Sequence, residues 1–234
     1  MFLLMLAMLF SSVAMAIPIY FVNQTGQPIA NSTVLVYVNG TSTAYTTNST
    51  GAINYTLLAN TTYLFVAEQN GTYYLFVNNT TGVNLTALTS MTLNASGFNY
   101  TKINVSVCNM TMNATLYYVT LPEDKVKVDV PSTIYTQNVS NITIMFPENM
   151  TMGHTKYKFN YVEVNGVKYN TTNVTVASDT NNNVTVYYVA QLSYLYVLLF
   201  IALIVVLCLI AYKLTRGPAA KSMGIRTKYY RRKY

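Results

Sequence analysis

The sequence contains no tryptophan, one histidine and two cysteines, and charged residues make up only 9% of its 234 positions. Two cysteines allow one disulfide at most. Cys208 lies within a long apolar run, and Cys108 lies in the chain before that run. A small extracellular module held together by several disulfides is therefore excluded. Any disulfide would have to join two chains, so the chain must stabilise itself by burying apolar surface.

The scarcity of ionisable side chains also argues against catalysis. Acid–base and nucleophilic mechanisms need a histidine or a pair of titratable groups, but His154 is the one histidine and the acids are scattered except for Glu123 and Asp124. Copper(I) prefers thiol, thioether and imidazole ligands, which the chain offers at Cys108, Met110, Met112, Met150, Met152 and His154. A blue-copper site needs a second histidine, so we interpret these methionines as core or surface residues. We expect no enzyme, no metal site and no cofactor.

Two apolar segments define the predicted topology. Residues 1–16 combine a short apolar block with Ala14 and Ala16 at the spacing of a signal-peptidase site, which predicts a cleaved signal peptide, with an uncleaved N-terminal anchor as the alternative. Residues 192–212 contain no charge and as a helix would be about 31 Å long, enough to cross hydrocarbon. We therefore predict a transmembrane helix at residues 191–212.

The net charge of +7 arises at the C-terminal end. Eight of the 14 Lys and Arg residues follow residue 212 with no acid among them, whereas six lysines and all seven acids precede it. Basic residues are retained on the cytoplasmic side of a membrane, so residues 213–234 are predicted to be a basic cytoplasmic tail near anionic lipid. The preceding chain is then extracellular, in a single-pass type I arrangement at the cell membrane. Nucleic acid is not an expected partner.

N-glycosylation sequons are the most abundant motif. Of 25 asparagines, 21 stand in Asn-x-Ser/Thr, all between residues 17 and 191, whereas chance placement would give about six. This excess predicts an exported, densely N-glycosylated chain. The candidate acceptors are Asn23, Asn31, Asn39, Asn48, Asn54, Asn60, Asn70, Asn78, Asn84, Asn94, Asn99, Asn104, Asn109, Asn113, Asn138, Asn141, Asn149, Asn170, Asn173 and Asn183.

Almost every segment before residue 192 alternates β-branched or aromatic with polar residues, which predicts an all-β fold. A glycosylated asparagine must face solvent, so its neighbours in a strand must face inward. The rule places these apolar residues inward: Val34, Val36 and Val38; Ile53, Tyr55 and Leu57; Ile142, Ile144 and Phe146; Val174 and Val176; Val184, Val186 and Tyr188. Asn104 differs in parity from Asn109 and Asn113. Residues 103–113 therefore cannot form one flat strand, and a bulge or turn is predicted near Cys108.

The first part of the predicted extracellular region has a recognisable order of turns and strands. An extended run is followed by the turn Gly26-Gln27-Pro28-Ile29, the alternating strand 34–38, the turn 47–51 and a strand at 63–67. Residues 17–82 thereby resemble the carboxypeptidase-regulatory-like (transthyretin-like) β-sandwich family, whose members show such turns and a closing Tyr-bearing strand. The resemblance implies a β-sandwich that serves as a stalk, spacer or binding module, without catalysis.

The second part contains the clearest hairpin. In residues 162–169, Asn165 and Gly166 favour a two-residue type I′ turn, which sets Glu163 opposite Lys168. The following strands continue a meander that resembles the short β repeats of many microbial surface proteins. We predict two small β-sandwich-like modules, 17–121 and 122–190, with residues 83–121 either completing the first or forming a layer between the two.

Sequons are absent from residues 114–137 and 150–169, and these two segments hold nine of the 13 charges of the predicted extracellular region. A charged surface without glycans is where a partner protein could dock. We therefore assign Lys125, Lys127, Lys156, Lys158, Glu163 and Lys168 to a hypothetical partner interface. The alternative is that charged segments are already soluble and need no sugar.

Low charge also suits an acidic habitat, because carboxylates lose their charge in acid whereas Asn, Thr and Tyr are unaffected. In composition the chain resembles envelope proteins of archaea that live in acid, or of their viruses. We expect a non-enzymatic glycoprotein of the cell envelope with a structural, shielding or interaction role. The alternatives are an accessory subunit of a larger membrane complex, docked through the glycan-poor region 122–190, and a viral envelope glycoprotein.

Overall fold

The computed structural model describes residues 16–106, 111–118, 121–137, 141–153, 155–191 and 194–215. The chain divides into two compact units, residues 1–190 and 191–234. The predicted signal peptide lies outside the described residues apart from Ala16, and the predicted tail does so beyond Thr215.

Strands dominate the first unit. In chain order the described strands are β1 (Ala16–Val22), β2 (Thr33–Val38), β3 (Thr41–Thr46), β4 (Ala52–Thr56), β5 (Thr62–Gln69), β6 (Thr72–Asn79), β7 (Met91–Asn94), β8 (Asn99–Val105), β9 (Met112–Tyr118), β10 (Leu121–Val130), β11 (Ser132–Thr136), β12 (Ile142–Met145), β13 (Asn149–Met152), β14 (Thr155–Val164), β15 (Val167–Tyr169), β16 (Asn173–Val176) and β17 (Asn182–Gln191). One turn of 3-10 helix, η1 (Leu85–Ala87), precedes β7. The prediction of strands throughout this region is confirmed.

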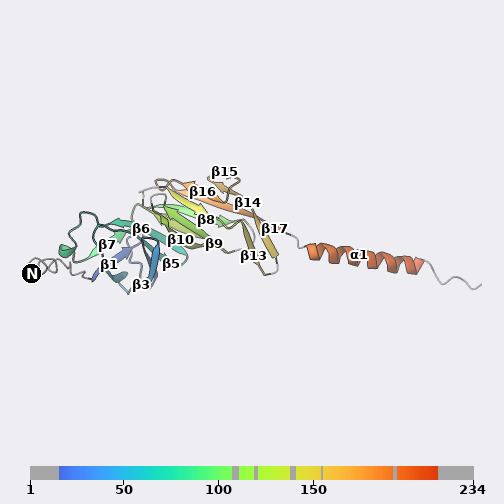
Figure 1. Ribbon diagram of the computed structural model, residues 1–234, viewed down its shortest axis with the longest axis horizontal. Helices are drawn as coiled ribbons and strands as arrows, with labels where there is room; N and C mark the ends of the chain where they lie inside the picture. Colours follow the sequence, from blue (N-terminus) through green and yellow to red (C-terminus); the bar gives the residue numbers. More distant parts are fainter. Residues whose placement is uncertain are drawn as a thin grey trace, which may run out of the picture. The chain divides into compact units, whose positions relative to one another are not determined.

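The strands form three sheets (Figure 1). The ten-stranded sheet has the order β13-β14-β17-β8-β11-β6-β5-β2-β3, with β15 paired to β14. The four-stranded sheet has the order β10-β9-β12-β16, and the three-stranded sheet has the order β4-β1-β7. Strands from both halves of the unit share the ten-stranded sheet, because β11 lies between β6 and β8 while β17 pairs in parallel with β8.

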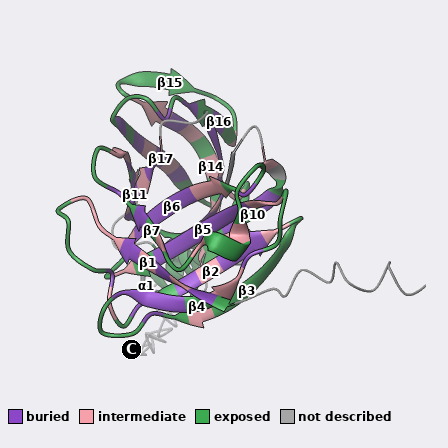
Figure 2. Ribbon diagram, turned by 90° about the vertical axis from the view of Figure 1, so that its left-hand side faces the viewer, coloured by how far each residue is buried: buried purple, intermediate pink, exposed green. Residues whose placement is uncertain are grey.

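Two hydrophobic clusters lie on opposite faces of the ten-stranded sheet. Alternate residues of β5 belong to different clusters: Leu64 packs with apolar residues of the four-stranded sheet, whereas Phe65 packs with residues of the three-stranded sheet. Side chains of a strand alternate between faces, so β5 is covered on both sides. Figure 2 shows this as unbroken burial along much of β5 and β6. The three sheets therefore form three layers over this part of the unit.

Local sequence explains the tight turns. Asn39-Gly40, Asn70-Gly71 and Asn165-Gly166 each join two paired strands, and all six residues have positive φ. This is the backbone of a type I′ turn, which favours Asn-Gly. The predicted hairpin at 162–169 is confirmed, including the pairing of Glu163 with Lys168.

The turn at 47–51 is held by buried polar contacts. The Thr47 hydroxyl donates to the Ile29 carbonyl at 2.7 Å and accepts the Ser32 N–H at 2.9 Å. Gly51 is buried with φ of +76°, and a Cβ there would lie 2.9 Å from the Phe21 carbonyl oxygen. Only glycine fits this position without strain.

The rule that sequon asparagines face outward predicts burial well. Ile53, Leu57, Ile142, Ile144, Phe146, Val174, Val176, Val184, Val186 and Tyr188 are buried as predicted, together with Val34 and Val36, while Val38 and Tyr55 are half-buried. Strand β8 ends at Val105 and β9 begins at Met112. Residues 103–113 therefore do not form one strand, as predicted, although Cys108 itself lies outside the described residues.

The prediction of a transmembrane helix is contradicted. Helix α1 (Tyr194–Thr215) occupies the predicted segment, yet no helix in the described part of the chain is both long and apolar enough to cross a membrane. The fold is corrected accordingly to a β-rich unit followed by a separate helix.

Candidate functional site

The sequon asparagines form the largest set of candidate residues, and none that the structure describes is buried. The exposed ones are Asn31, Asn39, Asn48, Asn54, Asn60, Asn70, Asn84, Asn94, Asn113, Asn141, Asn149, Asn170, Asn173 and Asn183. Asn23, Asn78, Asn99 and Asn104 are half-buried, and Asn109 and Asn138 lie outside the described residues. Asn79 also stands in a sequon, overlapping that of Asn78, and is exposed. The candidate list missed it because the two motifs overlap.

Asn182 provides the contrast within the same chain. It is 3% exposed and is not in a sequon. Its amide nitrogen donates to the carbonyls of Ala177 and Thr180 at 2.8 and 3.0 Å, and its amide oxygen accepts from the Asn165 amide at 3.0 Å. Burial of an asparagine thus coincides with a structural role and with the loss of the motif.

Several loop sequons share one local geometry. The hydroxyls of Thr25, Thr50 and Thr86 each donate to the side-chain oxygen of the asparagine two residues earlier, at 2.8, 2.7 and 2.7 Å. The N–H groups of Thr25 and Thr50 donate to the same oxygens at 3.0 and 2.9 Å, which forms the Asx turn typical of loops. These bonds use the amide oxygen and not the nitrogen to which a glycan would be attached. Both groups of the motif are therefore presented together at the surface.

Asn78 and Asn99 differ from the loop sites. Their amide nitrogens donate to the Met91 sulfur at 2.8 Å and to the Ser178 carbonyl at 3.1 Å, respectively. The threonines of the two motifs, Thr80 and Thr101, are each only 1% exposed. An enzyme that must reach both the amide and the hydroxyl has little access to either site in the folded protein.

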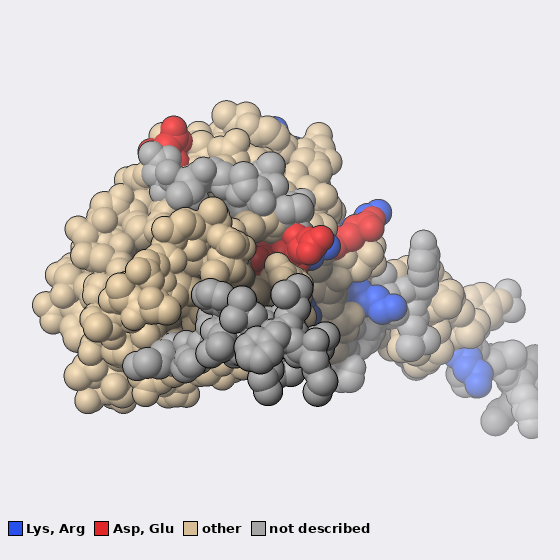
Figure 3. All heavy atoms as spheres, turned by 60° about the vertical axis from the view of Figure 1, so that its left-hand side comes forward, with Lys and Arg blue, Asp and Glu red and all other residues tan. Residues whose placement is uncertain are grey.

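The residues of the hypothetical partner interface fall into two groups. Lys125 and Lys127 are exposed on β10 of the four-stranded sheet, whereas Lys156, Lys158, Glu163 and Lys168 lie on β14 and β15 of the ten-stranded sheet. On the face shown in Figure 3, most of the described atoms belong to uncharged residues.

An aromatic cluster organises the second group. Tyr161 and Tyr187 stack with ring centroids 4.3 Å apart, and the Lys168 ammonium lies 3.9 Å from the centroid of the Tyr161 ring. The Tyr187 hydroxyl donates to the Glu163 carboxylate at 3.4 Å. A cation over an aromatic face is attracted by the ring quadrupole. Lys168 and Glu163 are thus both held by tyrosines rather than projecting freely into solvent.

Asp124 was not predicted to be buried, yet it is only 4% exposed. Strand β10 shifts register between Leu121 and Val126, which is a β-bulge. Asp124 has the parity of the buried Val126 and Val128, so strand alternation turns it inward, and its carboxylate accepts the Gly40 N–H at 2.9 Å. Burial raises the pKa of Asp124 above its ordinary value of 3.8, the Gly40 hydrogen bond lowers it in part, and the Glu123 charge raises it. The alternation of Val126, Val128 and Val130 with charged residues is a local signal for the inward side of β10, whereas the partner of Asp124, the Gly40 N–H, is 84 residues away.

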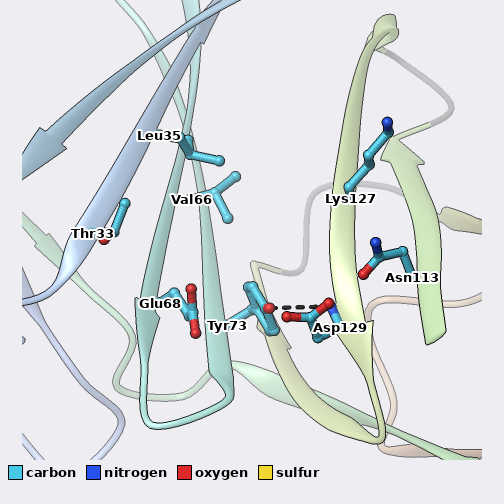
Figure 4. A pocket seen from close by; sticks show the side chains of 8 residues that line it. All are labelled: Thr33, Leu35, Val66, Glu68, Tyr73, Asn113, Lys127 and Asp129. Carbon is cyan, nitrogen blue, oxygen red and sulfur yellow. Dashed lines mark hydrogen bonds between the residues drawn. The ribbon is translucent and has the colours of Figure 1, made fainter. Parts of the chain in front are cut away.

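A small pocket lies between β2, β5 and β6 on one side and β9 and β10 on the other (Figure 4). Its volume is about 240 Å³, and its lining residues are Thr33, Leu35, Val66, Glu68, Tyr73, Asn113, Lys127 and Asp129. The Tyr73 hydroxyl accepts the Asp129 N–H at 3.1 Å. Burial raises the pKa of Tyr73 above 10, and the charges of Glu68 and Asp129 raise it further, while the Asp129 N–H lowers it in part. The Tyr73 phenol is therefore uncharged at neutral pH.

The pocket is smaller than the roughly 300–1,000 Å³ of ordinary ligand sites. The described residues contain no group of three or more His, Cys, Asp or Glu side chains able to hold a metal ion. Of the soft ligands considered from the sequence, Met112 is buried, Met150 is half-buried and Met152 is exposed, while Cys108, Met110 and His154 lie outside the described residues.

Comparisons with protein-family models and with curated proteins find no match. Among solved structures, the chain is similar to a mutant of the shaft pilin spaA from Lactobacillus rhamnosus GG, with 7% identity over 76% of this chain and 99% of the pilin chain. The TM-score of 0.26 is too low for this likeness to support an argument about fold or function.

Proposed function

We propose that this chain is an exported, densely N-glycosylated and non-enzymatic component of the cell envelope, with a structural or shielding role. One observation carries the proposal: every sequon asparagine in the described residues is exposed or half-buried, whereas the buried Asn182 lies outside the motif. A sequon must be exposed to be glycosylated. If the sequons were not used, their asparagines could be buried as Asn182 is.

The composition of the surface supports the same role. Charged residues make up only 9% of the chain, well below the share of about 25% in typical soluble domains. Exposed positions are filled largely by Thr, Asn and Ser, as on β3, where five of six residues are exposed and none is charged. Hydrated sugars at the sequons would supply the solubility that charge supplies elsewhere.

Site-by-site glycopeptide mapping tests the proposal. The full chain is produced in a host that N-glycosylates sequons, and occupancy is measured by mass spectrometry. We expect high occupancy at loop sites such as Asn23, Asn48 and Asn84, where the motif is presented at the surface. Asn160 and Asn181 are exposed asparagines outside sequons and serve as internal controls that must stay unmodified. Unmodified asparagines at the loop sites would overturn the proposal.

Asn78 and Asn99 add a test of how the sugar is attached. Their amide nitrogens and the hydroxyl-bearing Thr80 and Thr101 are engaged or buried in the folded protein. We expect them to be modified only while the chain is unfolded. Exposing refolded, sugar-free protein to the transferase should therefore leave both sites empty while Asn48 becomes occupied.

Docking of a partner protein is a second candidate function, supported by the exposed and sequon-free pair Lys125 and Lys127 on β10. A partner with acidic groups could approach the open edge of β10, since the sequon of Asn113 lies on the neighbouring strand β9, opposite Asp129. Amine-directed crosslinking of native cell envelopes followed by mass spectrometry is the test. Crosslinks from these lysines to another protein would support docking, whereas crosslinks within the chain alone would refute it.

A further inference from the structure

Each sheet of the first unit has open edges. Among the described residues, β3, β13 and β15 pair on one side only in the ten-stranded sheet, as do β4 and β7 in the three-stranded sheet and β10 and β16 in the four-stranded sheet. An edge strand presents unpaired N–H and C=O groups, which can pair with a strand of another molecule and cause aggregation. Proteins usually block edges with charged residues, prolines or bulges.

Five of these edge strands have none of the usual protection in their sequences. Strands β3 (TSTAYT), β4 (AINYT), β7 (MTLN), β13 (NMTM) and β16 (NVTV) contain no charged residue and no proline. Each of them carries or adjoins a sequon instead. Asn54, Asn94, Asn149 and Asn173 lie within β4, β7, β13 and β16, and Asn39 and Asn48 flank β3.

Strand β10 shows the opposite pattern. Glu123, Lys125, Lys127 and Asp129 alternate along it and are all exposed, and the strand contains a proline and a register shift. No sequon lies within it or next to it in the sequence, although Asn113 of the neighbouring strand β9 pairs with Asp129. The short β15 is intermediate, because it contains Lys168 and is followed by the sequon of Asn170. Edge strands without charged residues thus carry or adjoin a sequon, and the edge strand with the most charged residues has none.

We propose that the glycans on the uncharged edge strands prevent those edges from pairing with strands of other copies of this chain. The inference rests on the proposed glycosylation and gives a defined task to a subset of the sequons. A strand that pairs with an edge must approach to about 4.8 Å over the length of the strand. A glycan on an exposed asparagine of the edge strand would hinder this approach by its bulk. The charged side chains of β10 hinder it by electrostatic repulsion and by their bound water.

The test compares two triple variants of the full chain, each lacking three sugars. Asn54→Gln, Asn149→Gln and Asn173→Gln remove sequons from three edge strands, whereas Asn104→Gln, Asn113→Gln and Asn183→Gln remove them from the interior strands β8, β9 and β17. Self-association is measured by sedimentation velocity in mild detergent, because α1 exposes apolar side chains. We expect the edge variant to associate at a concentration at least about tenfold below that of the interior variant and the parent.

Two further variants separate edge protection from other effects. The triple variant Asn54→Lys, Asn149→Lys and Asn173→Lys restores charge without sugar, and we expect it to stay monomeric. The triple variant Thr56→Ala, Thr151→Ala and Thr175→Ala abolishes the same three sequons with the asparagines intact, and should associate as the glutamine variant does. This second route covers the case in which the glutamine variant fails to fold.

The outcomes distinguish the two proposals. If glycopeptide mapping of the parent finds no sugar at any sequon, the proposed function is wrong. If Asn54, Asn149 and Asn173 are occupied, but their loss gives no more association than loss of the interior sites, the edge inference alone is overturned. Association of the lysine variant equal to that of the glutamine variant would overturn it as well.

Discussion

Alanine at Gly51 should destabilise the first unit through a clash with backbone that cannot move. Its Cβ would lie 2.9 Å from the Phe21 carbonyl oxygen, 3.0 Å from the Pro28 Cβ and 3.1 Å from the Ile29 nitrogen. The Phe21 carbonyl and the Ile29 N–H are hydrogen-bonded to each other at 2.9 Å, and the Phe21 N–H donates to the Gly51 carbonyl. Relief of the clash therefore requires breaking at least one of these bonds.

The expected cost has two parts. A non-glycine residue in the left-handed region costs about 1–2 kcal/mol, and overpacking of a site that cannot relax costs about 1–3 kcal/mol. The matched control is Gly71→Ala, because Gly71 has φ of +72° but a Cβ added there would meet no atom within 4 Å. Both changes reduce the entropy of the unfolded chain equally, so their difference reports the clash alone.

Urea unfolding followed by tyrosine fluorescence provides the assay, since the chain has 22 tyrosines and no tryptophan. With a denaturant slope of about 2 kcal/mol per molar urea, a clash worth about 2 kcal/mol lowers the midpoint of Gly51→Ala by roughly 1 M relative to Gly71→Ala. If the two variants unfold at the same urea concentration, the close approach at Gly51 does not exist and the account of this turn is wrong.

Three further predictions test buried polar groups. Burial raises the pKa of Asp124, so its contribution to stability is full below pH 3.8 and is lost as the pH rises through the raised value; Asp124→Asn should therefore be more stable than the parent in urea at pH 7, with the difference vanishing in acid. Asn182→Ala leaves three hydrogen-bonding partners unpaired and should lower the free energy of unfolding by about 2–3 kcal/mol, against less than about 0.5 kcal/mol for the exposed Asn160→Ala. Thr47→Val keeps the shape but loses two buried hydrogen bonds, so thermal unfolding should show a loss of about 2 kcal/mol that Thr43→Val, at an exposed position, does not.

Features encoded by neighbouring residues could be predicted from the sequence. The hairpin around Asn165 and Gly166 followed from two residues whose backbone preference fits one turn type. The inward-facing residues of five segments were predicted from two facts. Side chains alternate between the two faces of a strand, and a sequon asparagine must face solvent to be glycosylated. Both arguments use only positions a few residues apart, where the chain itself fixes the geometry.

Features that depend on distant pairing could not be predicted. Strands β8, β11 and β17 have the same alternating pattern as their neighbours, so nothing local indicates that β11 lies between β6 and β8 or that β17 is parallel to β8. The hydrogen bond between the Asp124 carboxylate and the Gly40 N–H joins a strand of one sheet to a turn of another. The prediction of a transmembrane helix was wrong, since no helix in the described residues is both long and apolar enough to cross a membrane.

The position of β8 sets the order in which synthesis and folding can proceed. Its two neighbours in the sheet are β11 and β17, and β17 ends at Gln191. A ribosome must therefore release nearly all of the first unit before β8 has both partners, and contacts between such distant segments form slowly. During this delay Asn99, which lies on β8 and donates to the Ser178 carbonyl in the finished fold, stands on an incompletely paired strand. The interleaved topology would thus give the proposed glycosyltransferase time to reach Asn99 before the finished fold closes that site.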